Sequence, residues 1–169
     1  GESSLFLALN RNKQSIALNT RSKLGREIIH RLVKESDIFI ESYGPGIADE
    51  MGLGYQQLKS LKPSIVYCSV SPFGEEGPYR ERPTSELELQ GLSGVIQFLG
   101  EPGEPPVRVG ADVVSIITAI HTASAILAAL YNRQRTGLGQ KVSVSMLDVA
   151  LWMGRYWLIS QGNPDEYGG

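Results

Sequence analysis

The sequence predicts an α/β protein in which a mostly parallel sheet is flanked by helices. Short apolar β-type runs alternate along the chain with helical segments, the order typical of parallel strands joined by crossover helices. Two of these runs end in loops rich in glycine and proline, at residues 42–46 and 71–79. Because ligands of such sheets bind beyond the carboxyl ends of the strands, we expect both loops to lie at a binding site.

The first half of the chain is predicted to contain three strands and two helices. The strands are Ser15–Leu18, Asp37–Glu41 and Ser64–Val70, each built around a short apolar run. Ser22–Lys34 predicts an amphipathic helix, because its apolar residues recur at the spacing of one helix face. A shorter helix is expected at Tyr55–Leu61, where a proline soon after stops it.

The second half of the chain is predicted to be mainly helical. Ser85–Leu99 is expected to be a helix with two glutamates near its start, where acidic residues suit the helix dipole. A short β-type run, Val107–Val109, precedes a long helix that opens with the apolar segment Val113–Tyr131 and is expected to end before Gly137. Lys141–Ser145 is a predicted strand that leads into a final amphipathic helix, Met146–Gln161.

Asp112 stands at the predicted start of the long helix. Gly110 permits a tight turn before it, and Gly137 suits the position just after the helix end. The Asp112 carboxylate has two interpretations: an ordinary N-cap, or a nucleophilic or acid–base group kept ionised by the helix N-terminus. The local pattern does not separate them. Asp148, in the first turn of the last helix, is interpreted as an ordinary helix-start residue.

Composition argues against several classes of function. A net charge of −2 on 169 residues, without a basic tract, gives no reason to expect a nucleic-acid partner. The long apolar helix carries Ser, Thr and His and is barely long enough to span a bilayer, which favours a helix buried in a soluble core and no membrane partner. Two histidines and no clustered cysteines argue against a transition-metal site.

The single cysteine, Cys68, rules out a disulfide within these residues and is consistent with a reducing, cytoplasmic setting. It lies in an apolar run, so we expect a buried and unreactive thiol.

Six stretches together are typical of one known family. They are Leu9–Leu18, Glu41–Gly46, Met51–Tyr55, Gly74–Tyr79, Gln90–Gly94 and Arg135–Gln140. In this order they resemble the class III CoA-transferases, a family that includes formyl-CoA, crotonobetainyl-CoA and succinyl-CoA-dependent transferases and the related α-methylacyl-CoA racemases. The resemblance covers nearly the whole chain.

The resemblance implies a Rossmann-like large domain, a smaller domain and an interlocked homodimer. Residues 1–169 would then be the central part of the large domain, with the N-terminal βα unit and the C-terminal small domain absent. It also implies an acyl-CoA and a small carboxylic acid as partners. Coenzyme A would enter as a thioester substrate, with no permanently bound cofactor and no metal.

The resemblance assigns catalytic roles to two carboxylates. Asp112 falls where the transferases have an aspartate that attacks the donor thioester, after which covalent aspartyl intermediates carry CoA to the acceptor acid. Glu86 falls at the position of an assisting glutamate. We expect backbone N–H groups around Asp112 to stabilise the developing oxyanions.

The CoA contacts of the family carry over to two stretches of this chain. They are Leu18, Asn19, Thr20 and Arg21, and then Ser42, Tyr43 and Gly44. Arg21 is expected to pair with a phosphate and Tyr43 to pack on the adenine. Glu50 stands where the family has an arginine near the CoA phosphates, and Arg11 or Lys13 is a candidate to replace that charge.

Two alternatives stay open. The first is a racemase or epimerase acting on α-methylacyl-CoA, but Ser85 occupies the position of the racemase histidine, and serine cannot supply a second base at neutral pH. The second is a non-catalytic CoA-binding homologue in which Asp112 is only a helix cap.

Overall fold

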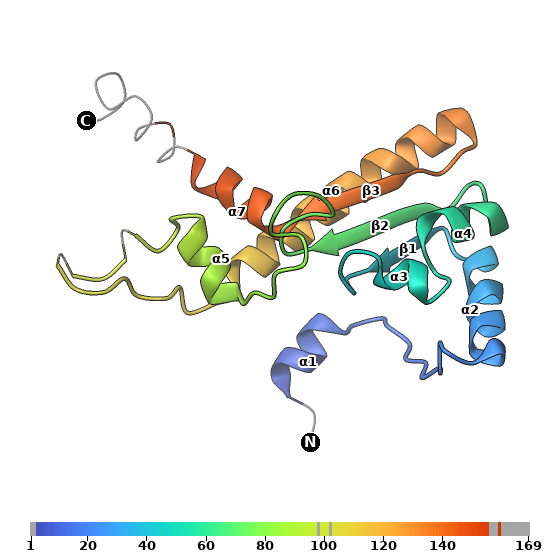
Figure 1. The fold of residues 1–169 in the computed structure, drawn as a ribbon, viewed down its shortest axis with the longest axis horizontal. Helices are drawn as coiled ribbons and strands as arrows, with labels where there is room; N and C mark the ends of the chain where they lie inside the picture. Colours follow the sequence, from blue (N-terminus) through green and yellow to red (C-terminus); the bar gives the residue numbers. More distant parts are fainter. Residues whose placement is uncertain (1–2, 98, 102, 156–158, 160–169) are drawn as a thin grey trace.

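The computed structural model describes residues 3–97, 99–101, 103–155 and 159, which form an α/β fold around a three-stranded parallel sheet (Figure 1). The elements in chain order are α1 Ser4–Leu9, α2 Lys23–Glu35, β1 Ile38–Glu41, α3 Ile47–Glu50, α4 Tyr55–Leu61, β2 Val66–Ser71, α5 Glu86–Leu92, α6 Val113–Thr136, β3 Lys141–Ser145 and α7 Met146–Met153. The strand order is β1-β2-β3, with β2 paired in parallel to both neighbours. The predicted fold class is confirmed.

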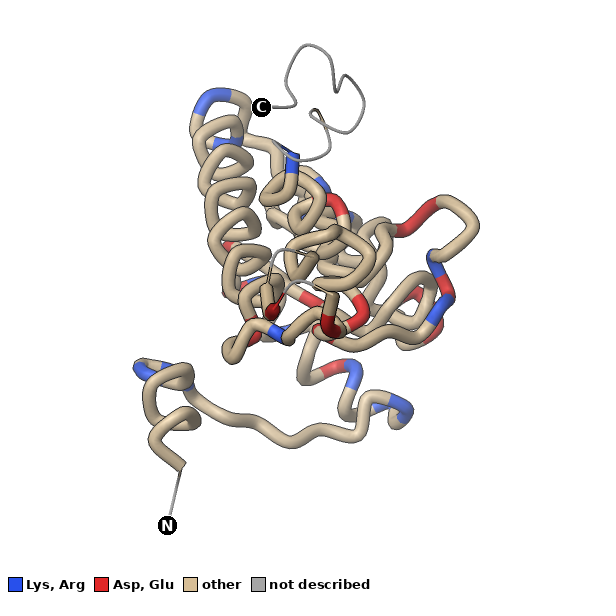
Figure 2. The backbone as a smooth tube through the Cα atoms, turned by 90° about the vertical axis from the view of Figure 1, so that its left-hand side faces the viewer, with Lys and Arg blue, Asp and Glu red and all other residues tan. Residues whose placement is uncertain are grey.

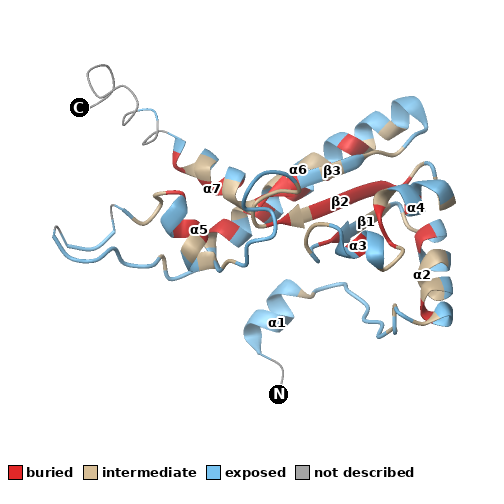
Figure 3. Cartoon of the chain, viewed as in Figure 1, coloured by how far each residue is buried: buried red, intermediate tan, exposed pale blue. Residues whose placement is uncertain are grey.

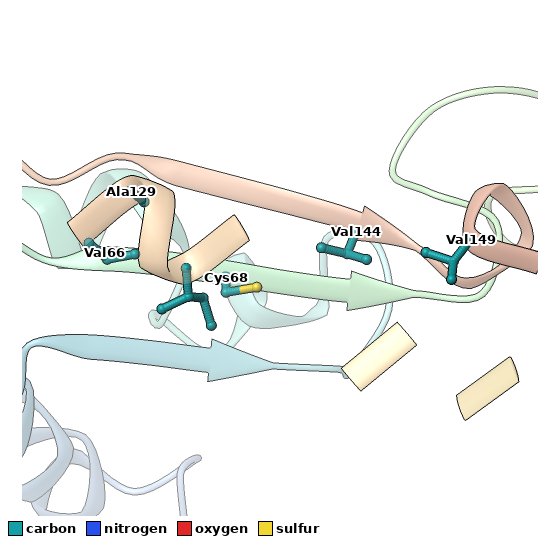
Figure 4. Packing of buried hydrophobic residues seen from close by; sticks show 6 residues of the cluster. Val66, Cys68, Ala129, Val144 and Val149 are labelled. Carbon is teal, nitrogen blue, oxygen red and sulfur yellow. The ribbon is translucent and has the colours of Figure 1, made fainter. Parts of the chain in front are cut away.

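The central strand β2 is buried on both faces because helices cover both sides of the sheet. Val66 and Cys68 point toward α6, where they pack with Ala129. Val144 of β3 and Val149 of α7 belong to the same buried cluster (Figure 4). This alternation is the period-two pattern of a strand, and the near-continuous apolar run of β2 is typical of parallel sheets.

The opposite face of β2 carries Tyr67. It packs with Val33 of α2 and Leu58 of α4, and its ring stacks on Phe39 of β1 at 5.4 Å between centroids. Cys68 is fully buried, as predicted, and burial raises the pKa of its thiol to about 11, with a further contribution from the charge of Glu41.

Helix α6 ends as predicted, with Gly137 in the left-handed conformation at φ 74°. Most of its length carries no charge, and its two arginines, Arg133 and Arg135, lie at its C-terminal end (Figure 2). The expectation of a buried helix is correct for one face only. Val114, Thr118 and Ile126 are buried against the sheet and its neighbours, whereas a stripe on the other side is exposed: Ile116, Ile120, Leu127 and Tyr131 (Figure 3).

By length and composition α6 could cross a membrane. In this structure its buried face packs against β2, β3 and α7, which is the arrangement of a helix that covers a sheet.

Three predicted elements differ from the structure. The described residues 15–18 and 107–109 form no strand, and nearly all of their side chains are exposed (Figure 3). Short β-type runs form strands only where a neighbouring strand pairs with them, and neither run lies beside the sheet. The helix predicted to reach Leu99 ends at Leu92, ahead of Gly94 at φ 73°. The predicted end of the last helix at Gln161 lies outside the described residues.

Candidate active site

The N-terminus of α6 places Asp112 at the edge of the structure without using its carboxylate as a cap. Asp112 occupies the N-cap position but, unlike the serines that precede other helices here, makes no side-chain cap bond. Its Oδ1 accepts a hydrogen bond from Nη2 of Arg108 at 2.7 Å, and its side chain is 62% exposed. The interpretation of Asp112 as an ordinary side-chain N-cap is therefore wrong.

Glu86, the first residue of α5, caps α6 instead. Its carboxylate accepts from the backbone N–H of Val114 at 2.7 Å and of Ser115 at 3.1 Å, and from the Ser115 hydroxyl at 2.7 Å. This places the start of α5 beside the start of α6 (Figure 1). The structure thus brings both predicted catalytic carboxylates to one helix N-terminus, although they are 26 positions apart in the sequence.

Two opposing effects set the pKa of Glu86. Partial burial penalises the charged form and on its own would raise the pKa of the carboxyl. Hydrogen bonds from the side chains of Gln90 and Ser115 and from the backbone of Val114 and Ser115 outweigh it, so the pKa lies below its ordinary value. Glu86 is therefore an anion at neutral pH, matched to the positive end of the α6 dipole.

The first-turn N–H groups of α6 are all engaged. Glu86 takes those of Val114 and Ser115, Ala111 O accepts from Val113 N at 2.9 Å, and Asp112 O accepts from Ile116 N at 3.0 Å. The expectation that backbone N–H groups stabilise oxyanions is therefore not met by this turn. Instead, the cation in direct contact with the Asp112 carboxylate is the Arg108 guanidinium.

A cleft of about 370 Å³ opens at the carboxyl ends of β1 and β2, where the sequence predicts a binding site. Its lining comes from the two predicted loops and the residues after them: Ser42, Tyr43, Gly44, Pro45, Ile47, Pro72, Arg80, Glu81, Arg82 and Pro83. Buried Glu41 fixes the first loop by accepting from the backbone N–H of Tyr43 at 2.9 Å.

Arg80 and Arg82 are functional candidates that the sequence reasoning missed. Both line the Tyr43 cleft, and the Arg82 guanidinium lies 5.5 Å from the ring centroid of Tyr79. Each also pairs with a glutamate, Arg80 with Glu81 and Arg82 with Glu88. Their position directly after the predicted binding loop at residues 71–79 is the sequence feature that could have identified them.

The other predicted CoA-binding stretch, residues 18–21, is not part of this cleft. It lies before α2, where the Asn19 side chain accepts from Arg21 N at 3.0 Å and Asn19 O accepts from the Ser22 hydroxyl at 2.8 Å. Lys13, a candidate to replace the missing arginine, bonds Leu9 O at 2.7 Å within its own segment. Arg80 and Arg82 are better placed for that role, since they share a cleft with Tyr43.

An apolar groove of about 650 Å³ lies along the length of α6. It runs between β1 and α6, and its lining includes Ser42 from the predicted CoA-binding loop and Ser115, whose hydroxyl bonds Glu86. Among the described residues the buried hydroxyls of Thr118 and Thr122, also in its lining, have no hydrogen-bond partner. Ser42 and Ser115 thus line one apolar surface that continues along α6 as far as Leu130.

Comparisons with known proteins agree with the sequence resemblance. The chain matches the family described as CoA-transferase family III over residues 1–168. It is 41% identical to the formyl-CoA:oxalate CoA-transferase of Streptomyces coelicolor, covering 98% of this chain and 42% of that protein. It is 37% identical to the succinyl-CoA:glutarate CoA-transferase of Mus musculus, covering 86% of this chain and 34% of that protein.

A solved structure gives the same result. The crystal structure of a CAIB/BAIF family protein from Brucella suis has a TM-score of 0.86 and 35% identity to this chain, and covers 92% of this chain and 41% of that one. The chain thus spans less than half the length of these relatives. The match over residues 1–168 confirms the resemblance, and the chain belongs to CoA-transferase family III.

Proposed function

We propose that the full-length protein transfers CoA from an acyl-CoA to a carboxylic acid, with Asp112 as the nucleophile and Glu86 assisting. The observation that carries this proposal is that two different carboxylates lie at the start of α6 and make different contacts. Glu86 supplies the helix cap, and Asp112 keeps an exposed carboxylate that contacts Arg108. A carboxylate that caps its own helix would have to give up those bonds in order to attack a substrate.

The proposed reaction balances as two exchanges at the Asp112 carboxyl. The carboxylate attacks the donor thioester carbonyl, forms a mixed anhydride and releases CoA thiolate. The thiolate attacks the aspartyl carbonyl of the anhydride, which gives an aspartyl-CoA thioester and frees the donor acid. The acceptor carboxylate then attacks the aspartyl thioester, which forms a second mixed anhydride and releases CoA thiolate. The thiolate attacks the acceptor carbonyl of this anhydride, which gives the new acyl-CoA and regenerates the Asp112 carboxylate. Covalent catalysis divides one difficult exchange into easier steps.

Two residues have supporting roles in this proposal. Arg108 pairs with the carboxylate before attack and offers its charge to the oxyanion that forms on the carbonyl oxygen. Glu86 holds the first turn of α6, on which Asp112 depends for its position, through three bonds to Val114 and Ser115.

We place the adenine end of CoA in the Tyr43 cleft and the thioester end toward Asp112. Tyr43 is half exposed and offers an aromatic surface, and Arg80 and Arg82 supply cations for the phosphates. Ser42, which also lines the Tyr43 cleft, and Ser115, which follows Asp112 by three positions, both line the apolar groove, which supports this orientation. Residues 18–21 are proposed as a separate contact for CoA outside this cleft, since Arg21 is exposed just before α2.

The racemase alternative is less well supported. Ser85, at the position of the racemase histidine, is the N-cap of α5, and its hydroxyl accepts from the backbone N–H of Glu88 at 3.3 Å. A serine used as a helix cap is not a proton acceptor for an α-carbon at neutral pH.

Sequence similarity to transferases named for oxalate and glutarate favours small dicarboxylic acids as acceptors.

The proposal is tested with the full-length protein in D₂O, supplied with formyl-CoA, acetyl-CoA or succinyl-CoA and with oxalate, succinate or glutarate, and separately with an α-methylacyl-CoA, which carries the α-carbon hydrogen that a racemase would exchange. Mass spectrometry follows both CoA migration and α-carbon deuterium. CoA migration without deuterium uptake is the expected result. Deuterium without migration would make the protein a racemase, and CoA binding without either reaction would make it a non-catalytic homologue.

A further inference from the structure

A buried glutamine connects Glu86 with the segment that precedes Asp112. Gln90 belongs to α5 and is fully buried. Its Oε1 accepts from Val109 N at 3.2 Å, and its Nε2 donates to Ala111 O at 3.3 Å and to Glu86 Oε1 at 3.0 Å. A buried carboxamide must find such partners, because leaving its polar atoms unpaired is costly.

All three partners surround Asp112 without including it. Val109 and Ala111 belong to the segment directly before Asp112, and Glu86 caps the helix directly after it. Residues 107–111 form no helix or strand and are largely exposed, so few other contacts fix their course. Gln90 therefore holds the chain on both sides of the Asp112 side chain.

We propose that Gln90 is a positioning residue that sets the place of the Asp112 carboxylate, by bonding the backbone of Val109 and Ala111 on one side and Glu86 on the other. This inference rests on the proposed nucleophilic role of Asp112. It also gives a function to the stretch Gln90–Gly94, which neither of the assigned carboxylates explains.

The three bonds require an amide. One group must accept from Val109 N–H and donate two N–H bonds, to Ala111 O and to the Glu86 carboxylate. Methionine has a similar length but makes none of these bonds. Ionised glutamate can accept from Val109 but cannot donate, and it adds a negative charge beside Glu86. Gln90→Met should thus release both Val109 and Ala111, whereas Gln90→Glu should release Ala111 and repel Glu86.

The test compares full-length wild type with Gln90→Met and Gln90→Glu, using a donor acyl-CoA that the wild type consumes. Hydroxylamine added during turnover converts the aspartyl thioester to a hydroxamate at Asp112, which mass spectrometry of the peptide quantifies. We expect the single-turnover rate of labelling and kcat to fall about 10- to 100-fold in both variants, because a displacement of about 1 Å is enough for such a loss. KM for the acyl-CoA should change less than about twofold, since Gln90 lines no part of the Tyr43 cleft.

Leu58→Ala is the control for a purely structural effect. Leu58 is fully buried in α4, on the face of the sheet opposite α6, so the variant lowers thermal stability without touching the network around Asp112. The labelling rate per folded molecule should match wild type in Leu58→Ala and fall in the Gln90 variants.

Three results would separate the claims. Labelling in the Gln90 variants as fast as in Leu58→Ala would overturn the positioning role and leave the transferase proposal intact. CoA transfer in wild type without any label at Asp112 would overturn the proposed nucleophile, and the role of Gln90 with it. If Gln90→Met does not fold, Gln90→Glu, which keeps the shape and the bond from Val109, decides the question.

Discussion

Helices α6 and α7 begin in different ways, although both have an aspartate near the start. In α7 the cap is local, since Ser145 precedes the helix and its hydroxyl accepts from Asp148 N at 3.2 Å. In α6 the residue at the N-cap position is Asp112, and the cap comes from Glu86 on another helix. A local cap satisfies the helix end and nothing more, whereas a remote cap leaves the N-cap side chain available for another task.

The remote cap also couples two helices. Leu89 of α5 and Val114 of α6 pack together with Ala150 of α7 in one buried cluster, so the Glu86 bonds are set by this packing. Any change at Glu86 therefore acts on the position of Asp112 as well as on stability. The hydroxyl of Ser145, the last residue of β3, makes its cap bond within the helix start that it precedes.

The largest expected difference between the two helix starts is in activity. Asp112→Asn should lower kcat at least about 10³-fold in the full-length protein, because an amide cannot act as the nucleophile. Its unfolding free energy should change by no more than about 1 kcal/mol, since the pair with Arg108 is exposed. CoA migration measured by mass spectrometry and urea denaturation check both values.

Asp148→Asn is the matched control for that substitution. Asp148 is exposed in the first turn of α7, and its side chain is assigned no role in transfer. We expect transfer within about twofold of wild type. Full transfer activity in Asp112→Asn would overturn the nucleophile, and equal losses in both variants would point to a general effect of removing charge.

The second difference appears when each cap is removed. Glu86→Ala removes three bonds to the start of α6 and should cost about 1–2 kcal/mol of unfolding free energy. It should also lower kcat about 10- to 100-fold because Asp112 loses its support. Ser145→Ala removes one bond and should cost about 1 kcal/mol without a change in kcat. Equal kcat values in the two variants would mean that Glu86 is only a helix cap.

The two helix starts also show which features of the structure could be predicted from the sequence. Periodicity and local capping chemistry predicted α4 and β3 to the residue and α2 within one residue at each end, because those patterns are encoded locally. The cap of α6 was not predicted, since it joins residues 28 and 29 positions apart through the packing of α5 on α6. The same is true of Gln90 and of the arginines at the Tyr43 cleft.

The strand predicted at Ser15–Leu18 failed for a related physical reason. A strand is defined by its partners, and residues 15–18 lie away from the sheet with their side chains mostly exposed. Local β-type composition gave no information about that separation.

A smaller effect on activity is expected just before α2, where one of the predicted CoA-binding stretches lies. Gly25 packs so closely that an added Cβ would lie 2.0 Å from Asn19 O, whereas a Cβ at Gly91 in α5 meets nothing within 4 Å. Gly25→Ala should cost about 1–3 kcal/mol of unfolding free energy and weaken acyl-CoA binding, because the Asn19 turn must move. Gly91→Ala should stabilise by about 0.5–1 kcal/mol.

Calorimetric titration with a nonreactive acyl-CoA analogue and urea denaturation check this pair. Destabilisation by Gly25→Ala without a change in affinity would remove residues 18–21 from the CoA site. Equal stabilisation in both variants would mean that the close contact at Asn19 does not exist in solution.

The smallest effect is a dependence of stability on pH that only the remote cap should show. The pKa of Glu86 is lowered in the folded protein by its hydrogen bonds from Gln90, Ser115 and Val114, which outweigh partial burial. Such a group contributes stability that is complete above its unfolded pKa, about 4.3, and is lost as the pH falls through its lower folded value. The difference in unfolding free energy between wild type and Glu86→Gln should therefore be constant near neutral pH and shrink below about pH 4.3. The Ser145→Ala difference should stay constant across the same range, since a hydroxyl cap does not titrate there. A Glu86→Gln difference that grows in acid would mean that the folded pKa is raised, and that the carboxylate does not cap α6 as an anion.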